Sequence, residues 1–376
     1  MRLVTIVGAR PQFVKLAPVS RAMASVRTAG DCGIEDIIVH TGQHYDIGMS
    51  SVFFSELGIP EPVANLAVGS GSHGEQTARM LMAIEDLLLK YAPQLVIVYG
   101  DTNSTLAGAL AAAKQHIPIA HVEAGLRSFD REMPEEVNRI VADHVSDILF
   151  APTATAMQNL GAENLAGRAE QVGDVMLDAV RFNTALSLEH STILKTLDLE
   201  SASFAVATLH RAGNTDSGRL QTLLDALNDV ALRFLPVVFP VHPRTRARIR
   251  ADLPSWRPGP NLQLVEPLGY LDMIRLVAGA KLVLTDSGGL QKEAFFLNVS
   301  CMTLREETEW PETVDGGGNV LVGADRTLIL KTAEAMVSRH AGSEAKTDYP
   351  VEQYFGDGHA AEAIVSSIVN FVAARS

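Results

Sequence analysis

The chain alternates short runs of valine, isoleucine and leucine with longer segments of helical periodicity, and the alternation restarts in its second half. This pattern is typical of parallel strands covered by helices on both faces of the sheet. The strands predicted in the first half are Leu3–Val7, Ile37–Thr41, Leu95–Tyr99, Ile119–Val122 and Ile148–Ala151. Those predicted in the second half are Phe204–Leu209, Val237–Val241, Leu262–Val265, Leu282–Thr285, Ser300–Leu304 and Val320–Val322. The sequence therefore predicts two α/β domains.

The length of 376 residues supports the same division, because it exceeds what one ordinary hydrophobic core accommodates. The first series of strands ends before Gly173–Arg181, where the join is expected. We predict an N-terminal domain over residues 1–172 and a C-terminal domain over residues 173–358. The terminal helix, residues 359–376, is expected to pack back on the first domain.

Charge and cysteine content narrow the class of protein. The chain has 31 lysines and arginines against 44 acidic residues, a net charge of −13, which argues against binding nucleic acid through its phosphates. Its only cysteines, Cys32 and Cys301, suggest neither a disulfide framework nor a cysteine metal site. No apolar run approaches the roughly 18 residues of a membrane span, and no signal peptide is recognisable. The expectation is a cytoplasmic protein without nucleic-acid or membrane partners.

One strand of the second half leads directly into a glycine pair. Leu282–Thr285 is followed by Asp286, Ser287, Gly288 and Gly289 and then by a helical pattern. The first turn of a helix has unpaired N–H groups and the positive end of the macrodipole, and glycine lets an anion come close. The Ser287 hydroxyl is a further donor, and Glu293 follows within the helix. We expect this segment to bind the phosphates of a nucleotide or nucleotide sugar; an ordinary tight turn is the alternative.

Polar residues also follow the other predicted strands. Because ligands collect beyond the carboxyl ends of parallel strands, these residues carry the most weight. In the first half they are Arg10, Gln43, His44, Asp101, Glu123 and Arg127, and in the second His210, Arg211, His242, Asp286, Ser287 and Arg305. If the two edges face one another across a cleft, one ligand contacts both domains.

Several of these residues have two interpretations. Lys15, in the helix after Arg10, either faces a phosphate or is solvated. Asp101 suits the N-cap of the next helix as well as catalysis. Glu123 follows apolar residues, so either burial raises its pKa or it forms an ion pair with Arg127. Glu135 lies in a first helical turn, where the dipole favours acids.

Two further patterns count against cofactors. The histidine spacings, His40 with His44 or His121 with Glu123 and Asp101, match no established metal site. The stretch Gly69–Gly74 reads GxGxxG, but it lies far from the first strand and lacks the acidic residue that a dinucleotide site needs. We interpret it as a flap and expect neither a metal nor a dinucleotide cofactor.

A series of motifs in fixed order then carries a family resemblance. They are GARPQFVK (8–15), TGQH (41–44), YGDTNST (99–105), HVEAGLR (121–127), MPEEVNR (133–139), TLHRAGN (208–214), PVHPRT (240–245), LTDSGGLQKEA (284–294) and TEWPE (308–312). Together they resemble the non-hydrolysing UDP-N-acetylglucosamine 2-epimerases over nearly the whole chain. The resemblance implies a GT-B fold of two Rossmann-like domains, an active site in the interdomain cleft, a homodimer, and a role in surface polysaccharide biosynthesis.

The resemblance also implies a reaction without a cofactor. UDP leaves by anti elimination to give a 2-acetamidoglucal and then returns, with protonation on the other face of C2, so that UDP-GlcNAc and UDP-ManNAc interconvert. The family's acid/base carboxylates correspond to Asp101, Glu123 and Glu135, and its phosphate-side histidine to His210. Which carboxylate serves which face stays open.

The UDP contacts implied by the resemblance are Arg10, Lys15, Ser287, Gly288, Gly289 and Glu293, with Glu293 accepting from the ribose hydroxyls. The uracil-side loop corresponds to the segment with Leu268 and Met273, which replace the family's usual glutamine and aromatic residue. A second, activating subsite would correspond to Gln43, His44 and His242.

Trp310 departs from the family pattern, since many members have arginine there. An indole cannot supply that charge to a phosphate or a uronate. The TEWPE form resembles a branch that includes epimerases of UDP-2,3-diacetamido-2,3-dideoxyglucuronate, which is the alternative substrate. Other functions left open are a GT-B glycosyltransferase, a hydrolysing epimerase, a non-catalytic UDP-sugar sensor and an NAD-dependent enzyme.

Overall fold

The computed structural model describes residues 1–376 except 30–32, 44–53, 202, 340–347 and 376. Cys32 and His44 therefore lie outside the described residues, whereas Cys301 is buried. The chain divides into two compact units, residues 1–179 with 352–376, and residues 180–351. Both divisions fall within helices, α7 (Val175–His190) and α15 (Val351–Phe355), rather than in loops. None of the helices described is long and apolar enough to span a membrane.

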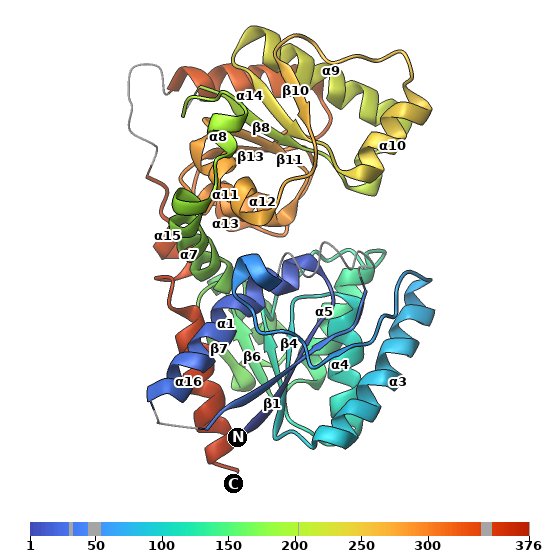
Figure 1. The fold of residues 1–376 in the computed structure, drawn as a ribbon, viewed down its shortest axis with the longest axis vertical. Coiled ribbons are helices and arrows are strands. Elements are labelled where there is room, and N and C mark those ends of the chain that lie inside the picture. The colour runs from blue at the N-terminus through green and yellow to red at the C-terminus, as the bar shows by residue number, and fades with distance from the viewer. Residues whose placement is uncertain (30–32, 44–53, 202, 340–347, 376) are drawn as a thin grey trace. The chain divides into compact units, whose positions relative to one another are not determined.

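Each unit is built on one parallel sheet (Figure 1). The first has the strand order β3-β2-β1-β4-β5-β6-β7 and the second β10-β9-β8-β11-β12-β13. The first set is β1 (Arg2–Val7), β2 (Glu35–His40), β3 (Ala64–Asn65), β4 (Leu95–Tyr99), β5 (Ile119–Val122), β6 (Ile148–Ala151) and β7 (Ala169–Gln171). The second is β8 (Ala205–Thr208), β9 (Val237–Pro240), β10 (Leu262–Val265), β11 (Leu282–Thr285), β12 (Ser300–Thr303) and β13 (Asn319–Leu321). The predicted α/β class with two parallel sheets is confirmed.

Helices connect the strands along the chain. In the first unit they are α1 (Arg10–Ala29), α3 (His73–Tyr91), α4 (Asn103–Lys114), α5 (Pro134–Val145), α6 (Ala154–Ala162), η1 (Ala166–Arg168) and α16 (Ala360–Ala373). In the second they are α8 (Ile193–Thr196), η2 (Ala212–Asn214), α9 (Ser217–Arg233), α10 (Pro243–Asp252), α11 (Tyr270–Gly279), α12 (Gly288–Phe296), α13 (Pro311–Asp315) and α14 (Arg326–Arg339).

Side-chain alternation along the strands of the second sheet creates two hydrophobic layers. On one face, Ala207 and Leu284 pack in a cluster with residues of α9 and α14. On the other, Val206 and Val283 pack with residues of α11 and α12. Successive side chains of a strand point to opposite faces, so a strand buried on both sides consists of consecutive apolar residues. The same rule explains the fully buried run Leu95–Tyr99 of β4.

The C-terminal helix α16 belongs to the first unit, where it packs against α1. Its buried stripe consists of Ile364, Val365, Ile368 and Val372. At its start, Asp178 of α7 accepts a hydrogen bond at Oδ1 from the N–H of Ala361, at 2.8 Å. A carboxylate at a helix N-terminus compensates the unpaired N–H groups and the dipole. Asp178 thus fixes the position of α16.

Asp178 is expected to make stability depend on pH. Burial raises its pKa to about 6, against hydrogen bonds from the start of α16, and Oδ2 is buried without a hydrogen bond in the described structure. Because the folded protein holds this proton more tightly than the unfolded chain, stability contributed here is present at low pH. It is lost as pH rises to about 6, by up to about 3 kcal/mol.

The variant Asp178→Asn keeps an acceptor for Ala361 and has no proton to lose. Urea denaturation of both proteins at several pH values in this range checks the expectation. The difference in unfolding free energy between variant and wild type is expected to shift in favour of the variant as pH rises. A difference that is constant with pH would contradict it.

Candidate active site

The turn between β1 and α1 is held by Gln12, a buried residue to which the sequence assigned no role. Its Oε1 accepts from the N–H of Gly8 at 2.8 Å, and its Nε2 donates to the Tyr99 carbonyl at the end of β4, at 2.9 Å. These bonds join the ends of two adjacent strands. Arg10, the first residue of α1, consequently lies at the carboxyl edge of the first sheet.

Lys15 and Glu123 form an ion pair at this edge. Burial lowers the pKa of Lys15, but attraction by the carboxylates of Glu123 and Asp101 outweighs burial and raises it above the ordinary value. Glu123 directly follows β5 and has a left-handed φ of 70°. Such a backbone is unfavourable for a residue with a side chain, and strain of this kind is common at functional sites. Lys15, Glu123 and Asp101 form one charged group, which we call the carboxylate cluster.

The alternative ion pair between Glu123 and Arg127 is wrong. The Arg127 guanidinium donates to Asp143 of α5 at 2.7 Å and to Glu163, after α6, at 2.7 and 2.8 Å. Two carboxylates from elements distant in sequence therefore satisfy the arginine. The pairing of Glu123 with Arg127 was predicted from their closeness in the sequence. It is wrong because the parallel sheet brings loops together that are distant in the sequence.

Asp101 is held at both its backbone and its side chain. Its carbonyl accepts from Asn138 Nδ2 at 2.9 Å, and its carboxylate is ion-paired to Arg139. The interpretation of Asp101 as a helix cap is wrong, since Thr102 caps α4 and accepts from the N–H of Thr105. The Asp101 side chain is 31% exposed and remains accessible to a ligand.

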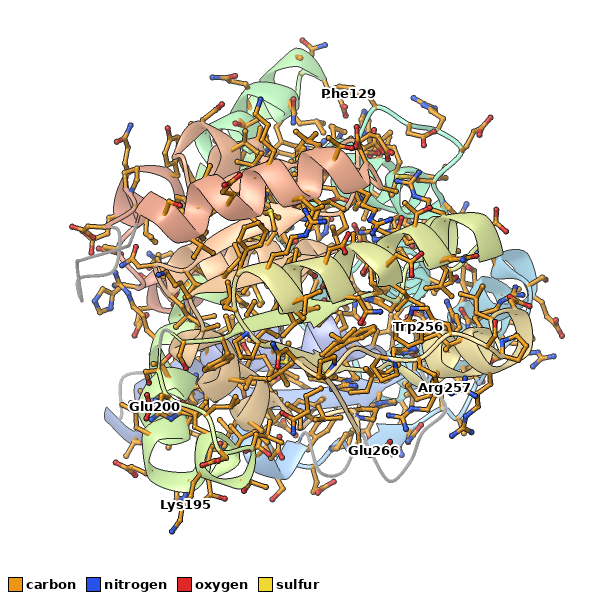
Figure 2. All side chains as sticks on the ribbon, turned by 90° about the horizontal axis from the view of Figure 1, so that it is seen from above. Phe129, Lys195, Glu200, Trp256, Arg257 and Glu266 are labelled. Carbon is orange, nitrogen blue, oxygen red and sulfur yellow. The ribbon has the colours of Figure 1, made fainter. Side chains whose placement is uncertain are left out.

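The two glutamates at the start of α5 have different environments. Glu136 is buried and accepts from the N–H groups of Ser128 and Phe129, at 2.8 and 3.0 Å. It thereby holds a loop that exposes the Phe129 side chain on the surface (Figure 2). Glu135 is exposed and makes no hydrogen bond or ion pair with any residue that the structure describes. Only Glu135 is available to a ligand.

In the second unit, Asp286 organises the loop after β8. It is fully buried and accepts from the N–H groups of His210 and Arg211, each at 3.0 Å. Burial raises its pKa, but the hydrogen bonds and charge of His210 outweigh burial and lower it. Asp286 is therefore ionised, and its contact with His210 Nδ1 at 3.1 Å orients that partly exposed ring. Asp286 positions the loop and does not face solvent.

The start of α12 is the segment for which the sequence predicts an anion cradle. Ser287 is its N-cap, accepting from the N–H of Leu290 at 3.4 Å. Space is open beside Gly289, where an added methyl group would meet only Ser287 Oγ at 4.0 Å. A methyl group at Gly288 would lie 3.4 Å from Oε2 of Glu309, and 3.7 Å from both Nη2 of Arg211 and Nε1 of Trp310. Helix N–H groups, a hydroxyl, a guanidinium and an indole N–H thus lie around this position, together with a carboxylate oxygen of Glu309.

Charge at this cradle is set by Glu309, which accepts from Arg305 at 2.9 Å and pairs with Arg211 at 3.2 Å. Burial raises the pKa of Glu309, but both arginines outweigh burial and lower it to about 2. Glu309 thus compensates one of the two guanidinium charges, and the ionised Asp286 lies against the backbone of Arg211. Trp310 is buried, and its ring covers Lys292 Nζ at 3.5 Å from the centroid. Trp310 itself is neutral, so the positive charges beside Gly288 come from the two arginines and Lys292.

Glu293 lies in the same helix and faces the Tyr270 hydroxyl of α11. Burial raises the pKa of Glu293 to about 7, partly offset by Tyr270 and Lys292. Leu268 and Met273 are partly buried and pack against the hydrophobic cluster beneath α11 and α12.

The residues predicted for an activating subsite fall in both units. Gln43 Oε1 accepts from the Ser104 hydroxyl at 2.7 Å in the first unit. His242 caps α10 in the second, accepting from the N–H of Arg244 at 3.2 Å, and its ring lies 5.9 Å from that of His210. His44 lies outside the described residues. Among the residues described, no three histidine, cysteine or acidic side chains are grouped to hold a metal.

Comparisons with known proteins show to which family the chain belongs. The model of the protein family described as UDP-N-acetylglucosamine 2-epimerase matches residues 27–369. The UDP-2,3-diacetamido-2,3-dideoxy-D-glucuronate 2-epimerase of Pseudomonas aeruginosa is 49% identical, over 97% of this chain and 98% of that protein. A UDP-N-acetylglucosamine 2-epimerase homolog of Methanococcus maripaludis is 48% identical, over 98% of this chain and 100% of that protein.

A solved structure gives the same result in three dimensions. The UDP-GlcNAc 2-epimerase of Methanocaldococcus jannaschii, in complex with UDP-GlcNAc and UDP, superimposes with a TM-score of 0.88 at 40% identity. The match covers 98% of this chain and 100% of that one. The fold is thus that of a two-domain GT-B protein, as the motifs implied. The chain belongs to the UDP-N-acetylglucosamine 2-epimerase family.

Proposed function

We propose that the protein is a non-hydrolysing 2-epimerase that interconverts UDP-GlcNAc and UDP-ManNAc. The observation that carries the proposal is the anion cradle at the start of α12, in a family member that also has the carboxylate cluster. The cradle suits the diphosphate of UDP, and the carboxylates suit proton transfer at C2. The predicted roles of the individual residues enter as part of this proposal.

In the first step, a carboxylate removes the C2 proton while the bond from C1 to the phosphate oxygen breaks, leaving UDP and a 2-acetamidoglucal. The second step reverses both changes, with the proton delivered to the other face of C2. Asp101, Glu123 and Glu135 supply the acid/base groups, a task worth about 10²- to 10⁴-fold in rate. Ser287, Gly288, Gly289, Arg10 and Lys15 bind UDP, and His210 stabilises the departing diphosphate.

A second UDP-sugar is also a candidate for the substrate. A UDP-2,3-diacetamido-2,3-dideoxy-D-glucuronate 2-epimerase is 49% identical to this chain, and a UDP-GlcNAc 2-epimerase structure 40%. The guanidinium pair Arg211 and Arg305, only partly neutralised by Glu309, also favours an anionic ligand. The uronate is therefore the second candidate substrate, with the same chemistry at C2.

Proton NMR in D2O distinguishes these functions. Each UDP-sugar is incubated with enzyme, without an acceptor and without a cofactor, and the C2 signal is followed. Deuterium at C2 with the epimeric UDP-sugar as product is expected. Free N-acetylmannosamine and UDP would indicate a hydrolysing enzyme, and UDP release only on adding an acceptor would indicate a glycosyltransferase. Binding without any turnover of either sugar would indicate a sensor and overturn the proposal.

Three finer points rest on the family resemblance. We propose that the protein is a homodimer, works in the cytoplasm and supplies precursors of surface polysaccharides. Light scattering coupled to size-exclusion chromatography tests the first point. A molar mass near that of one 40.4 kDa chain would contradict the dimer.

UDP affinity is expected to rise with pH through about 7. The carboxylate form of Glu293 accepts hydrogen bonds from two ribose hydroxyls better than the protonated form does. Burial raises the pKa of Glu293 to about 7. Below that pH, affinity falls by up to about tenfold per pH unit. Calorimetry with UDP between pH 6 and 8 measures the trend.

The variant Glu293→Gln separates this effect from titration of UDP itself, because the phosphate groups are common to both proteins. The ratio of wild-type to variant affinity is expected to increase with pH. A ratio that does not change between pH 6 and 8 would show that Glu293 does not accept hydrogen bonds from the ribose.

A further inference from the structure

The turn that carries Asp101 is held by side chains from several elements. Three consecutive carbonyls, those of residues 99, 100 and 101, each accept a hydrogen bond from a side chain, at distances of 2.6 to 2.9 Å. Their donors are Gln12 and Thr105 for the first, His121 for the second and Asn138 for the third. The backbone of this turn is therefore fixed to α1, α4, β5 and α5.

The carboxylate of Asp101 receives its own fixed partner. Arg139 of α5 is only 4% exposed, and its Nη2 pairs with Asp101 while its Nη1 donates to Glu136 at 3.0 Å. The planar guanidinium holds two carboxylates in a set direction, which a lysine ammonium does not do. Desolvation strengthens such charged hydrogen bonds.

The same arginine joins Asp101 to the start of α5. Glu136 accepts the N–H groups of residues 128 and 129, so the loop before α5 is fixed to the guanidinium through one carboxylate. Glu135 lies four positions before Arg139, one turn along the same helix. Side chains four apart lie on neighbouring parts of one helix face. Arg139 is therefore the shared contact of Asp101, Glu136 and the helix that carries Glu135.

We propose that Arg139 is a positioning residue of the epimerase reaction. It fixes the direction of the Asp101 carboxylate relative to α5, the helix that carries Glu135. The distance between the carboxylates of Asp101 and Glu135 therefore stays the same during both proton transfers. The inference rests on the proposed function for the identity of the reaction. Its geometric part, the placement of Asp101 by Arg139, does not depend on the substrate.

The test uses Arg139→Ala, Arg139→Lys and added guanidinium. A displacement of about 1 Å in a catalytic group lowers turnover by about 100-fold, so kcat of the alanine variant is expected to fall by that order with KM nearly unchanged. Millimolar guanidinium is expected to restore part of kcat in the alanine variant. The kcat of the lysine variant is expected to lie between those of wild type and the alanine variant. Rescue by a free guanidinium ion would not follow from a general loss of structure.

Arg79→Ala is the matched control, because Arg79 forms an exposed ion pair with Glu75 on α3 in the same unit. It is expected to keep wild-type kcat and to show no response to guanidinium. A wild-type protein that is inactive on both sugars would refute the proposed function. If wild type is active, the role of Arg139 would be refuted by a kcat of Arg139→Ala within threefold of wild type, or by the absence of rescue by guanidinium. A crystal structure of Arg139→Ala decides the geometric part in either case: an unmoved Asp101 side chain overturns it.

Discussion

Replacing Glu123 by glutamine is expected to lower kcat for epimerisation by about 10³-fold, the usual contribution of a positioned acid/base group. Glutamine keeps the size and the hydrogen-bonding oxygen of the side chain, but it neither takes up nor releases a proton. It also removes the ion pair with Lys15. Initial rates of C2 deuterium incorporation, measured by NMR, give kcat, and calorimetry gives the affinity for UDP.

UDP affinity of Glu123→Gln is expected to change far less than kcat, because Ser287, Gly288, Gly289 and Glu293 of the second unit are unaltered and Lys15 keeps its positive charge. The control is Glu163→Gln, which removes an ion-paired carboxylate of the same unit, the partner of Arg127. That variant is expected to keep wild-type turnover. If Glu123→Gln turned over as fast as the control, Glu123 would have no acid/base role.

Replacing Gly8 by alanine is expected to destabilise the first unit by about 3 kcal/mol, near the upper end of the usual penalty for overpacking. An added methyl group would lie 2.0 Å from Thr41 Oγ1 and 2.2 Å from Ser104 Oγ. These two buried hydroxyls are hydrogen-bonded to each other at 2.8 Å, so neither moves without losing its partner. The backbone must shift instead, which also displaces Arg10. Urea denaturation followed by circular dichroism measures the loss.

Gly161→Ala provides the comparison. Gly161 lies in α6, and an added methyl group would meet no atom within 4 Å. Alanine is favoured over glycine within helices by about 0.5 to 1 kcal/mol, so this variant is expected to be as stable as wild type or more stable. Equal effects of the two substitutions would show that the packing around Gly8 has room for a methyl group.

Hydrophobic pattern was sufficient to predict the fold class and nearly all strands, because fully buried parallel strands are continuous apolar runs. The exceptions are β3 (Ala64–Asn65) and β7 (Ala169–Gln171), which occupy the two edges of the first sheet. Edge strands are buried less and need fewer apolar residues. The segment Ala169–Gln171 has only alanine to indicate a strand, so periodicity alone does not reveal it.

At the site, the predicted residues that the structure describes follow the strands as expected, but their partners were not predictable. Glu123 pairs with Lys15 from another loop, and Arg127 with Asp143 and Glu163. Ion pairs depend on which loops the sheet order brings together, and local spacing contains no such information. The motif order identified the family, as the comparisons show.

The sequence did not reveal which buried residues support the site: Gln12 and Glu136 were given no role, and Asp286 was listed only as a polar residue that follows a strand. Gln12, Glu136 and Asp286 are polar side chains whose hydrogen bonds go to backbone N–H groups. A polar residue beside a strand end suggests ligand contact equally well whether it faces solvent or the backbone. The two roles, ligand contact and support of the backbone, differ in whether the side chain is buried. The hydrophobic pattern does not predict whether a single polar residue is buried.

Helix α16 has a consequence for the order in which the molecule is made. The first unit is completed by residues 352–376, which a ribosome adds only after the whole of residues 180–351. The second unit is one continuous segment and can fold during synthesis, while the first keeps the apolar surface of α1 uncovered until the end. A stop codon near residue 350 would therefore damage the unit encoded at the opposite end of the gene.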